Sequence, residues 1–397
     1  MSVHQLPGEV WIQVLGYLCV ADKHSVRATC IDFRELVDCG LLWKDWTIVL
    51  AFPKASYNSP FWEMLRRRKI NKVVVRSTRA KDWRQLARCL PSITTVVMER
   101  SSQEILDVLK NFTHLKHLAV RCSCTSLLLT ASAVHKAERL THLSICRVQF
   151  PSKSIEHLIS AFIDFRNLTS LVCHDTELNE ECTMTTYLIL GCLPRLKHLS
   201  LTCGRNVQAV LRHTTPLPVK EAHALSSLEL IHCDHSLPQD AMKLLPNLQR
   251  LVLIYKYSDK DFVADIWFAA MREDLKAWLS ALHRLSTLVI KLGPHVNRYV
   301  PNLIHLHIDP WPSCLGTITA EIPQLFPKLQ SLKIRGKHVP EEDFLGFQKM
   351  ADLRYVEMLD SRPQFSEMAA KLQVLTKYRV QVIDSHQRDI LDCDCSL

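Results

Sequence analysis

A single spacing of apolar residues, apolar-x-x-apolar-x-apolar, recurs twelve times between residues 70 and 358. The first copy is Ile70, Val73 and Val75, and the last is Leu353, Val356 and Met358. Most copies begin 22 to 29 residues after the copy before. A period of this length is typical of a solenoid, in which each unit buries its apolar face only by stacking on its neighbours.

Helical spacing fills the intervals between the copies. Ile105, Val108, Leu109 and Phe112, for example, recur at i, i+3, i+4 and i+7. Five copies follow an apolar-Pro step, and proline ends a helix and favours extended backbone before it. The sequence therefore predicts an α/β fold of strand–turn–helix units, a curved solenoid with a concave parallel sheet and outer helices. Two irregular steps, of 37 and 18 residues, predict a break, a protruding loop or a kink between about residues 255 and 300.

The first fifty residues follow a different pattern. Leu6-Pro7-Gly8-Glu9 precedes apolar residues at helical spacing, and Pro7 suits the first turn of a helix. Asp22 is a suitable N-cap for a second helix, on which Val26 and Phe33 belong to one apolar stripe. A helical hairpin of about forty residues is too small to bury all of its apolar surface. We expect it to offer an apolar face to the rest of the chain or to a partner.

This segment resembles the F-box. The family pattern begins with Leu-Pro-x-Glu and continues as a helix ending in Tyr-Leu, followed by an Asp, a Cys, an aromatic residue with a basic neighbour, and Leu-Trp. The matching residues are Leu6, Pro7, Glu9, Ile12, Leu15, Tyr17, Leu18, Asp22, Cys30, Phe33, Arg34, Leu42 and Trp43. The sequence departs from the family at Lys23 and His24, where apolar residues are usual.

The resemblance implies that the segment docks its apolar helices onto the small Skp-type adaptor of an SCF ubiquitin ligase, which also contains a cullin and a RING subunit. The residues expected to bind the adaptor are Leu6, Pro7, Ile12, Leu15, Leu18, Val26, Phe33 and Trp43. The other interpretation is a helical cap on the end of the repeats.

The repeats resemble the irregular leucine-rich repeats of the F-box/leucine-rich-repeat proteins, although the family's Asn or Cys after the last strand leucine occurs only as Cys233. The resemblance covers nearly the whole chain, as an F-box at 1–48, a linker or helical junction at 49–69, a solenoid at 70–382 and a tail at 383–397. It implies a receptor, without catalytic residues or cofactors, that holds a protein substrate for ubiquitination and degradation. The residues expected to face the substrate are His117, Arg121, His142, His198, Glu229, His305 and Asp309.

Two other function classes stay open. One is an interaction scaffold or inhibitor outside any ligase, and the other is a nucleic-acid-associated factor built on a basic stretch. Residues 66–88 contain ten Lys and Arg against Asp82 alone, and ten minus one equals the formal charge of +9 of the whole chain. The patch expected there is Arg66, Arg67, Arg68, Lys69, Lys72 and Arg76.

That basic patch has three interpretations: a solvated face, a docking site for an acidic partner, and a nuclear-localisation or nucleic-acid site. Binding of single-stranded nucleic acid uses exposed aromatic residues between the cations, and only Trp83 lies within the stretch. The nucleic-acid interpretation is therefore the least favoured of the three.

Histidine recurs at one position of the predicted strands. His117 and His142 come from consecutive copies, so their rings are expected side by side on strands about 4.8 Å apart. A metal site or pH switch is one interpretation, and contact with a ligand is another. The plain interpretation is a solvated or hydrogen-bonded ladder.

Composition excludes several other classes. The nine glycines never fall within four residues of one another, which rules out a dinucleotide fingerprint and a Walker loop. Fifteen cysteines, an odd number without paired C-x-x-C spacing, favour reduced thiols in a cytoplasmic or nuclear protein over disulfides or zinc. We expect no membrane span, because no apolar run reaches the ~20 residues that a bilayer requires.

Overall fold

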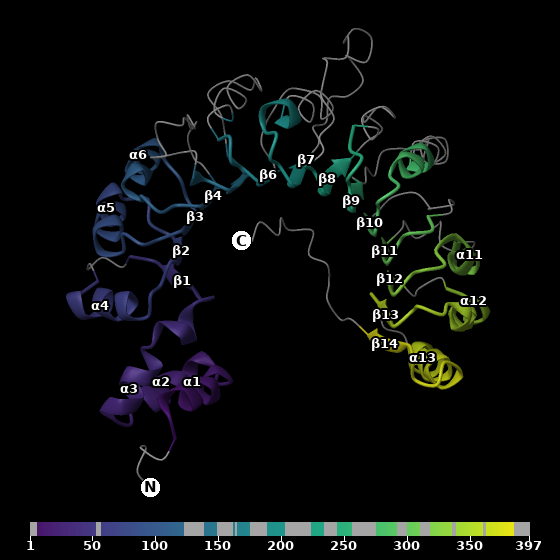
Figure 1. Cartoon of the computed structure of the whole chain (residues 1–397), viewed down its shortest axis with the longest axis horizontal. Coiled ribbons are helices and arrows are strands. Elements are labelled where there is room, and N and C mark those ends of the chain that lie inside the picture. The colour runs from purple at the N-terminus through teal and green to yellow at the C-terminus, as the bar shows by residue number, and fades with distance from the viewer. Residues whose placement is uncertain are drawn as a thin grey trace. The chain divides into compact units, whose positions relative to one another are not determined.

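The computed structural model describes thirteen stretches of the chain (Figure 1). These are residues 6–52, 57–122, 139–148, 162, 165–174, 189–202, 224–233, 244–255, 275–291, 300–309, 318–335, 339–359 and 363–384. The chain forms two compact units, which meet in sequence near residue 168. The N-terminal helices and the first five strands belong to the first unit, and the later strands belong to the second.

Parallel strands succeed one another in the order of the chain. They are β1 (Thr47–Leu50), β2 (Lys72–Val75), β3 (Thr95–Met98), β4 (His117–Arg121), β5 (His142–Cys146), β6 (Ser170–His174), β7 (His198–Thr202), β8 (Ser227–Cys233), β9 (Arg250–Tyr255), β10 (Thr287–Lys291), β11 (His305–Asp309), β12 (Ser331–Ile334), β13 (Tyr355–Met358) and β14 (Gln381–Asp384). The twelve predicted strands are confirmed as β2 to β13. The strands β1 and β14 add one strand before and one after the predicted series.

Alternation along each strand separates a buried face from an open one. Val73 and Val75 in β2, and Leu118 in β4, are fully buried, because the helices of their unit cover this face of the sheet (Figure 1). Parallel register aligns such anchors across strands, as in the pairing of Val96 with Leu118. The opposite face, called the open face below, carries the intervening residues of each strand.

The N-terminal module consists of α1 (Gly8–Gly16), α2 (Val20–Arg27), α3 (Ile31–Val37) and the 3-10 helix η2 (Gly40–Trp43). The predicted hairpin is therefore wrong, because a third helix follows the second. Asp22 is not the N-cap: α2 begins at Val20, and the Cys19 thiol accepts the N–H of Asp22. The thiol of Cys30 caps α3 in the same way.

The repeats of the first unit begin earlier than the predicted solenoid. Residues 49–69, expected to be a linker or helical junction, contain the end of β1 and the helix α4 (Ser59–Arg67). The next helices are α5 (Ala80–Cys89), α6 (Gln103–Val108) and η3 (Leu109–Asn111). Trp83 of α5 is fully buried, donates its indole N–H to the Ser77 carbonyl at 2.9 Å and lies edge-on to Phe112.

The second unit pairs β6 to β14 and places α11 (Ile318–Leu325), α12 (Glu341–Gly346), η7 (Phe347–Lys349) and α13 (Pro363–Leu375) beside them. Leu288 of β10 pairs with Leu251 of β9 and with Leu306 of β11. The sheet therefore continues through both irregular steps, and the predicted break is wrong for the sheet. Residues 256–274 and 292–299, where a protruding loop was predicted, lie outside the described residues.

Candidate protein-interaction site

The interior of the N-terminal module uses two residues that were expected to bind the adaptor. Leu15 and Trp43 are 2% and 4% exposed, so neither presents a side chain to a partner. The indole N–H of Trp43 donates to the Val37 carbonyl at 2.6 Å. Trp11 and Phe33 lie edge to face, with ring centroids 5.0 Å apart, and join α1 to α3. These contacts hold the helices of the module together.

Lys23, the point of departure from the family pattern, is almost fully buried. Its ammonium lies 5.9 Å from the ring centroid of Trp43 and 5.5 Å from that of Trp46. The aliphatic stem fills the place of an apolar residue, while the two aromatic faces stabilise the charge. The substitution is thus compatible with the fold of the module.

An apolar stripe of α1 remains exposed to solvent. Val10, Val14 and Tyr17 recur at i, i+4 and i+7, and Tyr17 is 92% exposed. Leu6 and Pro7 precede this stripe and are also exposed. Further exposed apolar residues of the module are Ile31 and Leu41. The other residues expected to bind the adaptor, Ile12, Leu18, Val26 and Phe33, are half-buried.

The exposed residues Val10, Val14, Tyr17, Ile31 and Leu41 were not among the predicted adaptor contacts. The helical spacing in the sequence contained the first three of them, but spacing alone does not say which side of an amphipathic helix faces its own module. We call Leu6, Pro7, Val10, Val14 and Tyr17 the α1 surface.

A buried ion network joins the module to the first repeat. The carboxylate of Asp38 accepts from Arg27 at 2.8 Å and from Arg68, which follows α4, at 2.9 Å. The Arg68 guanidinium also lies 3.9 Å from the centroid of the Trp43 ring. Burial by itself raises the pKa of Asp38, but the hydrogen bonds from Arg27 and Arg68 outweigh it and lower that pKa. Arg68 therefore belongs to the core of the junction, and its assignment to a surface patch is wrong.

The rest of the predicted basic patch divides according to its partners. Arg76 pairs with Glu99 at 2.8 Å, and Lys72 lies 3.8 Å from Asp45. Arg66 donates to the Cys89 carbonyl at 2.7 Å. Within the described residues Arg67 and Lys69 form no ion pair or hydrogen bond through their side chains, and both are exposed.

The open face of the first unit brings two predicted substrate residues together. His117 of β4 and His142 of β5 are paired in register, with ring centroids 4.1 Å apart. Thr95 hydrogen-bonds His117 at 3.2 Å, and Thr141 hydrogen-bonds His142 at 2.9 Å. The expectation that the two rings lie side by side is confirmed.

Both imidazoles are neutral at neutral pH. Burial, the neighbouring His142 and the charges of Lys72 and Lys116 lower the pKa of His117 to about 4. Burial also lowers the pKa of His142. The described part of the chain contains no group of three or more His, Cys, Asp or Glu positioned to hold a metal ion. The pair is arranged as a neutral hydrogen-bonding surface.

Other predicted substrate residues lie on strands of both units. Arg121 ends β4 and is half-buried, as is Glu229 in β8, while His305 at the start of β11 is exposed. His198 of β7 hydrogen-bonds Ser227 at 3.0 Å. Asp309 is nearly buried and accepts a bidentate pair from Arg335 at 2.6 and 2.7 Å, so its carboxylate is already neutralised within the fold.

The predicted set omits open-face residues of the last repeats. Lys333 of β12 and Glu357 of β13 form a cross-strand pair at 3.0 Å. Tyr355 and Ile383 are about half exposed on the same face. These residues could have been found from the sequence, because they occupy the alternate positions of their strands. The predicted set followed mainly the recurring histidines and therefore missed them.

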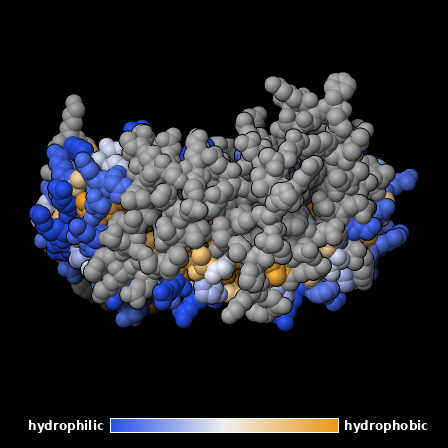
Figure 2. Space-filling model, turned by 90° about the horizontal axis from the view of Figure 1, so that it is seen from above, coloured by the Kyte–Doolittle hydropathy of each residue, from blue (hydrophilic) through white to orange (hydrophobic). Residues whose placement is uncertain are grey.

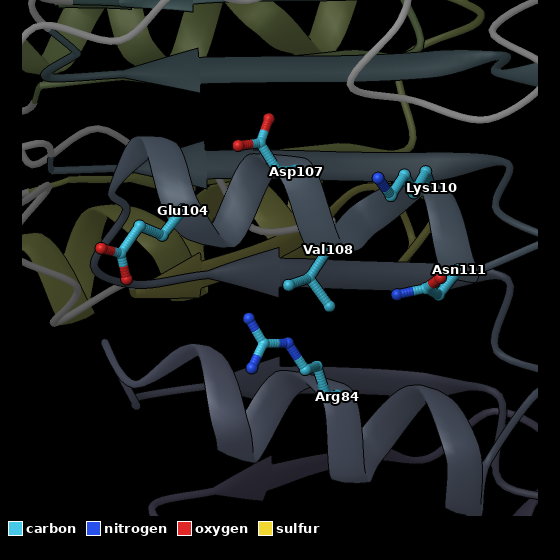
Figure 3. A pocket seen from close by; sticks show the side chains of 6 residues that line it. All are labelled: Arg84, Glu104, Asp107, Val108, Lys110 and Asn111. Atoms are coloured by element: carbon cyan, nitrogen blue, oxygen red, sulfur yellow. The ribbon is translucent and has the colours of Figure 1, made fainter.

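A cavity of about 450 Å³ opens between α5 and α6 (Figure 3). Its lining residues are Arg84, Glu104, Asp107, Val108, Lys110 and Asn111. Figure 3 shows Arg84 extending from α5 toward α6, with acidic and basic groups around the opening. Small-molecule sites are mostly apolar with a few polar groups, so this mixed charged lining does not match one.

Comparison with known families now identifies the module. A family model described as F-box-like matches residues 3–48. Residues 3–48 form an F-box-like domain. The parallel strands that follow, with their aligned leucine anchors, form a leucine-rich-repeat fold. A search of curated proteins finds no significant match to the chain.

Several solved structures share a low overall likeness with the chain. An internalin from Listeria monocytogenes is 13% identical, with 98% of this chain and 100% of that chain covered and a TM-score of 0.37. A leucine-rich-repeat protein from Leptospira interrogans is 14% identical, with 92% and 98% covered and a TM-score of 0.37. A leucine-rich-repeat-containing protein from Legionella pneumophila is 13% identical, with 84% and 98% covered and a TM-score of 0.42. Likenesses this low say nothing about function. Among the described helices, none combines the length and apolarity that crossing a bilayer would take.

Proposed function

We propose that this protein is the substrate receptor of an SCF-type cullin–RING ubiquitin ligase. The observation that carries the proposal is an F-box-like domain with an exposed apolar helix stripe, joined by a buried ion network to leucine-rich repeats. An F-box implies binding to a Skp-type adaptor, which connects to the cullin and RING subunits. The repeats would hold the substrate protein.

The α1 surface is the proposed contact with the adaptor. An exposed apolar stripe gains free energy when a partner removes it from water, at roughly 25 cal/mol per Å² of apolar area. Val14 and Tyr17 are 45% and 92% exposed, whereas Leu15 and Trp43 are buried in the interior of the module. Binding through α1 therefore leaves the fold of the module unchanged.

The open face is the proposed contact with the substrate. The Nδ1 atoms of His117 and His142 are hydrogen-bonded to Thr95 and Thr141, so the Nε2 atom of each ring would contact a peptide backbone or a polar side chain. The chemistry of ubiquitin transfer would belong to the associated E2 enzyme. This chain would contribute proximity, by holding substrate lysines near that enzyme.

The junction at Asp38 supports this mechanism. A flexible connection would let the two binding surfaces move independently and would lower the effective concentration of one near the other. Asp38 instead pairs with Arg27 of the module and Arg68 of the first repeat, and Arg68 also packs on Trp43. These contacts therefore link the module directly to the first repeat.

Co-purification from cells tests the proposal. The tagged wild-type chain is expected to recover a Skp-type adaptor and a cullin. The double variant Leu6→Ala/Pro7→Ala is expected to lose both, because it truncates the start of the α1 surface. The matched control Val374→Ala removes an exposed apolar side chain from α13 of the second unit and is expected to retain both. Recovery of neither protein by the wild type would instead favour an interaction scaffold outside any ligase.

A further inference from the structure

One rim of the first unit carries an excess of positive charge. At this rim the helices end and the strands begin, because each helix runs back along its repeat before the next strand starts. Exposed cations occur at the ends of α4, of α5 and of α6 with η3, and in segments that lead into β2 and β4. We call Arg67, Lys69, Arg88, Lys110 and Lys116 the basic rim.

Hydrogen bonds between repeats place these cations next to one another. Arg66 Nε donates to the Cys89 carbonyl, which brings the end of α4, with Arg67, near the end of α5, with Arg88. The N–H of Thr94 donates to Asn71 at 2.9 Å, and the N–H of Lys116 donates to Thr94 at 2.8 Å. The segments before β2, β3 and β4 are therefore adjacent along the rim.

The opposite rim of these repeats, where strands end and helices begin, carries both paired and unpaired cations. Arg76 pairs with Glu99 and Arg79 pairs with Asp82 at 2.7 Å, whereas the exposed side chains of Lys81 and Arg100 form no ion pair or hydrogen bond with any described residue. Through their side chains, the five residues of the basic rim form no ion pair or hydrogen bond with any described residue. Their charge is available to a partner.

One cation of the basic rim, Lys116, acts electrostatically on a neighbouring group together with Lys72. Lys72 and Lys116 contribute, after burial and His142, to lowering the pKa of His117. The surface over α4 to α6, at the left of Figure 2, is also predominantly hydrophilic. Lys72 and Lys116 therefore place positive charge near His117 at the start of β4.

We infer that the basic rim binds an acidic segment of a partner protein. Neighbouring strands are about 4.8 Å apart and packed helices about 8–10 Å apart. An extended peptide places every second or third side chain about 7–10 Å apart, which matches cations on successive repeats. The inference does not rest on the proposed ligase function.

An acidic peptide fits the rim better than a single-stranded nucleic acid. Nucleic-acid channels combine cations with aromatic side chains on which bases stack. Trp62 and Trp83, the tryptophans of these repeats, are 3% and 0% exposed and belong to the core. The ammonium groups of lysine and the guanidinium groups of arginine form charge-assisted hydrogen bonds with carboxylates, and these need no stacking partner.

Fluorescence anisotropy with the purified full chain tests the inference. The probe is a labelled twelve-residue peptide of alternating Glu and Gly, compared with its Gln–Gly counterpart and with a twelve-nucleotide uridine RNA. We expect the acidic peptide to bind more tightly than either, with an affinity that falls as salt is raised. Tighter binding by the RNA, or equal binding by the Gln peptide, would overturn the inference.

Matched charge reversals locate the binding. Lys69→Glu/Arg88→Glu changes the basic rim, and Lys81→Glu/Arg100→Glu makes the same change in charge at exposed residues of the opposite rim. We expect the first variant to weaken acidic-peptide binding at least tenfold and the second less than twofold, since salt screens charges beyond about 8–10 Å. Equal losses would show a diffuse effect of net charge and contradict a rim site. Lys69→Gln/Arg88→Gln, with thermal unfolding recorded, repeats the test without introducing acidic groups.

Discussion

The F-box-like module and the open face of the repeats differ in most of the residues that they expose. The module leaves apolar residues such as Val14 and Tyr17 in solvent, whereas the open face of the repeats presents histidine, threonine and charged pairs. An apolar stripe suits one constant partner, because burial of apolar area needs shape more than a specific pattern of polar groups. A polar face with hydrogen-bonded and charged groups suits recognition of a particular sequence or modification.

The two regions also differ in how they are stabilised. The repeats rely on aligned apolar anchors that are completely buried, such as Val73, Leu118 and Leu288. The junction of the module depends on a charged network around Asp38. Substitutions should therefore affect the two regions by different mechanisms and in different pH ranges.

The largest effect is expected in the core of the repeats. Trp83→Ala removes a fully buried indole, its hydrogen bond to Ser77 and its edge-on contact with Phe112. We expect the free energy of unfolding of the first unit to fall by about 3–5 kcal/mol. Urea unfolding followed by tryptophan fluorescence and circular dichroism measures it. A loss below about 1 kcal/mol would mean that this core is not packed as described.

Asp38→Asn should give the next largest effect. It leaves the Arg68 guanidinium buried without its anionic partner, and we expect a loss of about 2–4 kcal/mol, discounted because Arg27 is partly exposed. The folded pKa of Asp38 is lowered, so its contribution is present above the unfolded pKa of about 3.9 and is lost as pH falls through the folded value. At pH values below about 4, the free energy of unfolding of the wild type should therefore fall. The part of this fall that comes from Asp38 should be absent in the variant. Identical acid profiles for the two proteins would count against the network.

His117 should produce a smaller effect in a different pH range. Its folded pKa of about 4 lies below the unfolded value of about 6.5. The unfolded chain then binds the extra proton, so stability is full above about pH 6.5 and declines as pH falls toward 4. Because the ring is partly exposed to solvent, we expect about 1 kcal/mol for this component. His117→Gln should remove it from a plot of unfolding free energy against pH, and an unchanged slope between pH 4 and 6.5 would contradict the assignment.

The smallest effect on stability is expected at the α1 surface. Tyr17→Ala truncates a side chain that is 92% exposed, and we expect a change of less than about 0.5 kcal/mol in the free energy of unfolding. Thermal unfolding measures it. A loss as large as that of Trp83→Ala would show that Tyr17 supports the fold and is not free for a partner.

Most of the repeat fold could be predicted from the sequence, because three anchors in each copy state the period directly. The apolar spacing did not predict the terminal strands β1 and β14, and the reason is physical. In the register of β1, the position of the first anchor is Asp45, and in the register of β14 the outer two anchor positions are Arg379 and Asp384. End repeats have a neighbour on one side only and need fewer apolar anchors.

The site could be predicted only in part. Register made the contact between His117 and His142 predictable, because consecutive copies place equal positions on neighbouring strands. The pairing of Arg68 with Asp38 was not predictable, since 30 residues separate them and no period relates them. The side of α1 that faces the module could not be predicted from the sequence either. Val14 and Leu15 are adjacent apolar residues, but Val14 is exposed and Leu15 is buried.

Direct binding of the purified chain to a purified Skp-type adaptor tests the proposed role of the α1 surface. Isothermal titration should be carried out with the wild type, with Val14→Asp in the α1 surface and with Val374→Asp on α13 as the matched exposed control. We expect binding by the wild type and by Val374→Asp, and at least a tenfold loss of affinity for Val14→Asp with unchanged thermal unfolding. Failure of the wild type to bind, or full binding by Val14→Asp, would contradict it.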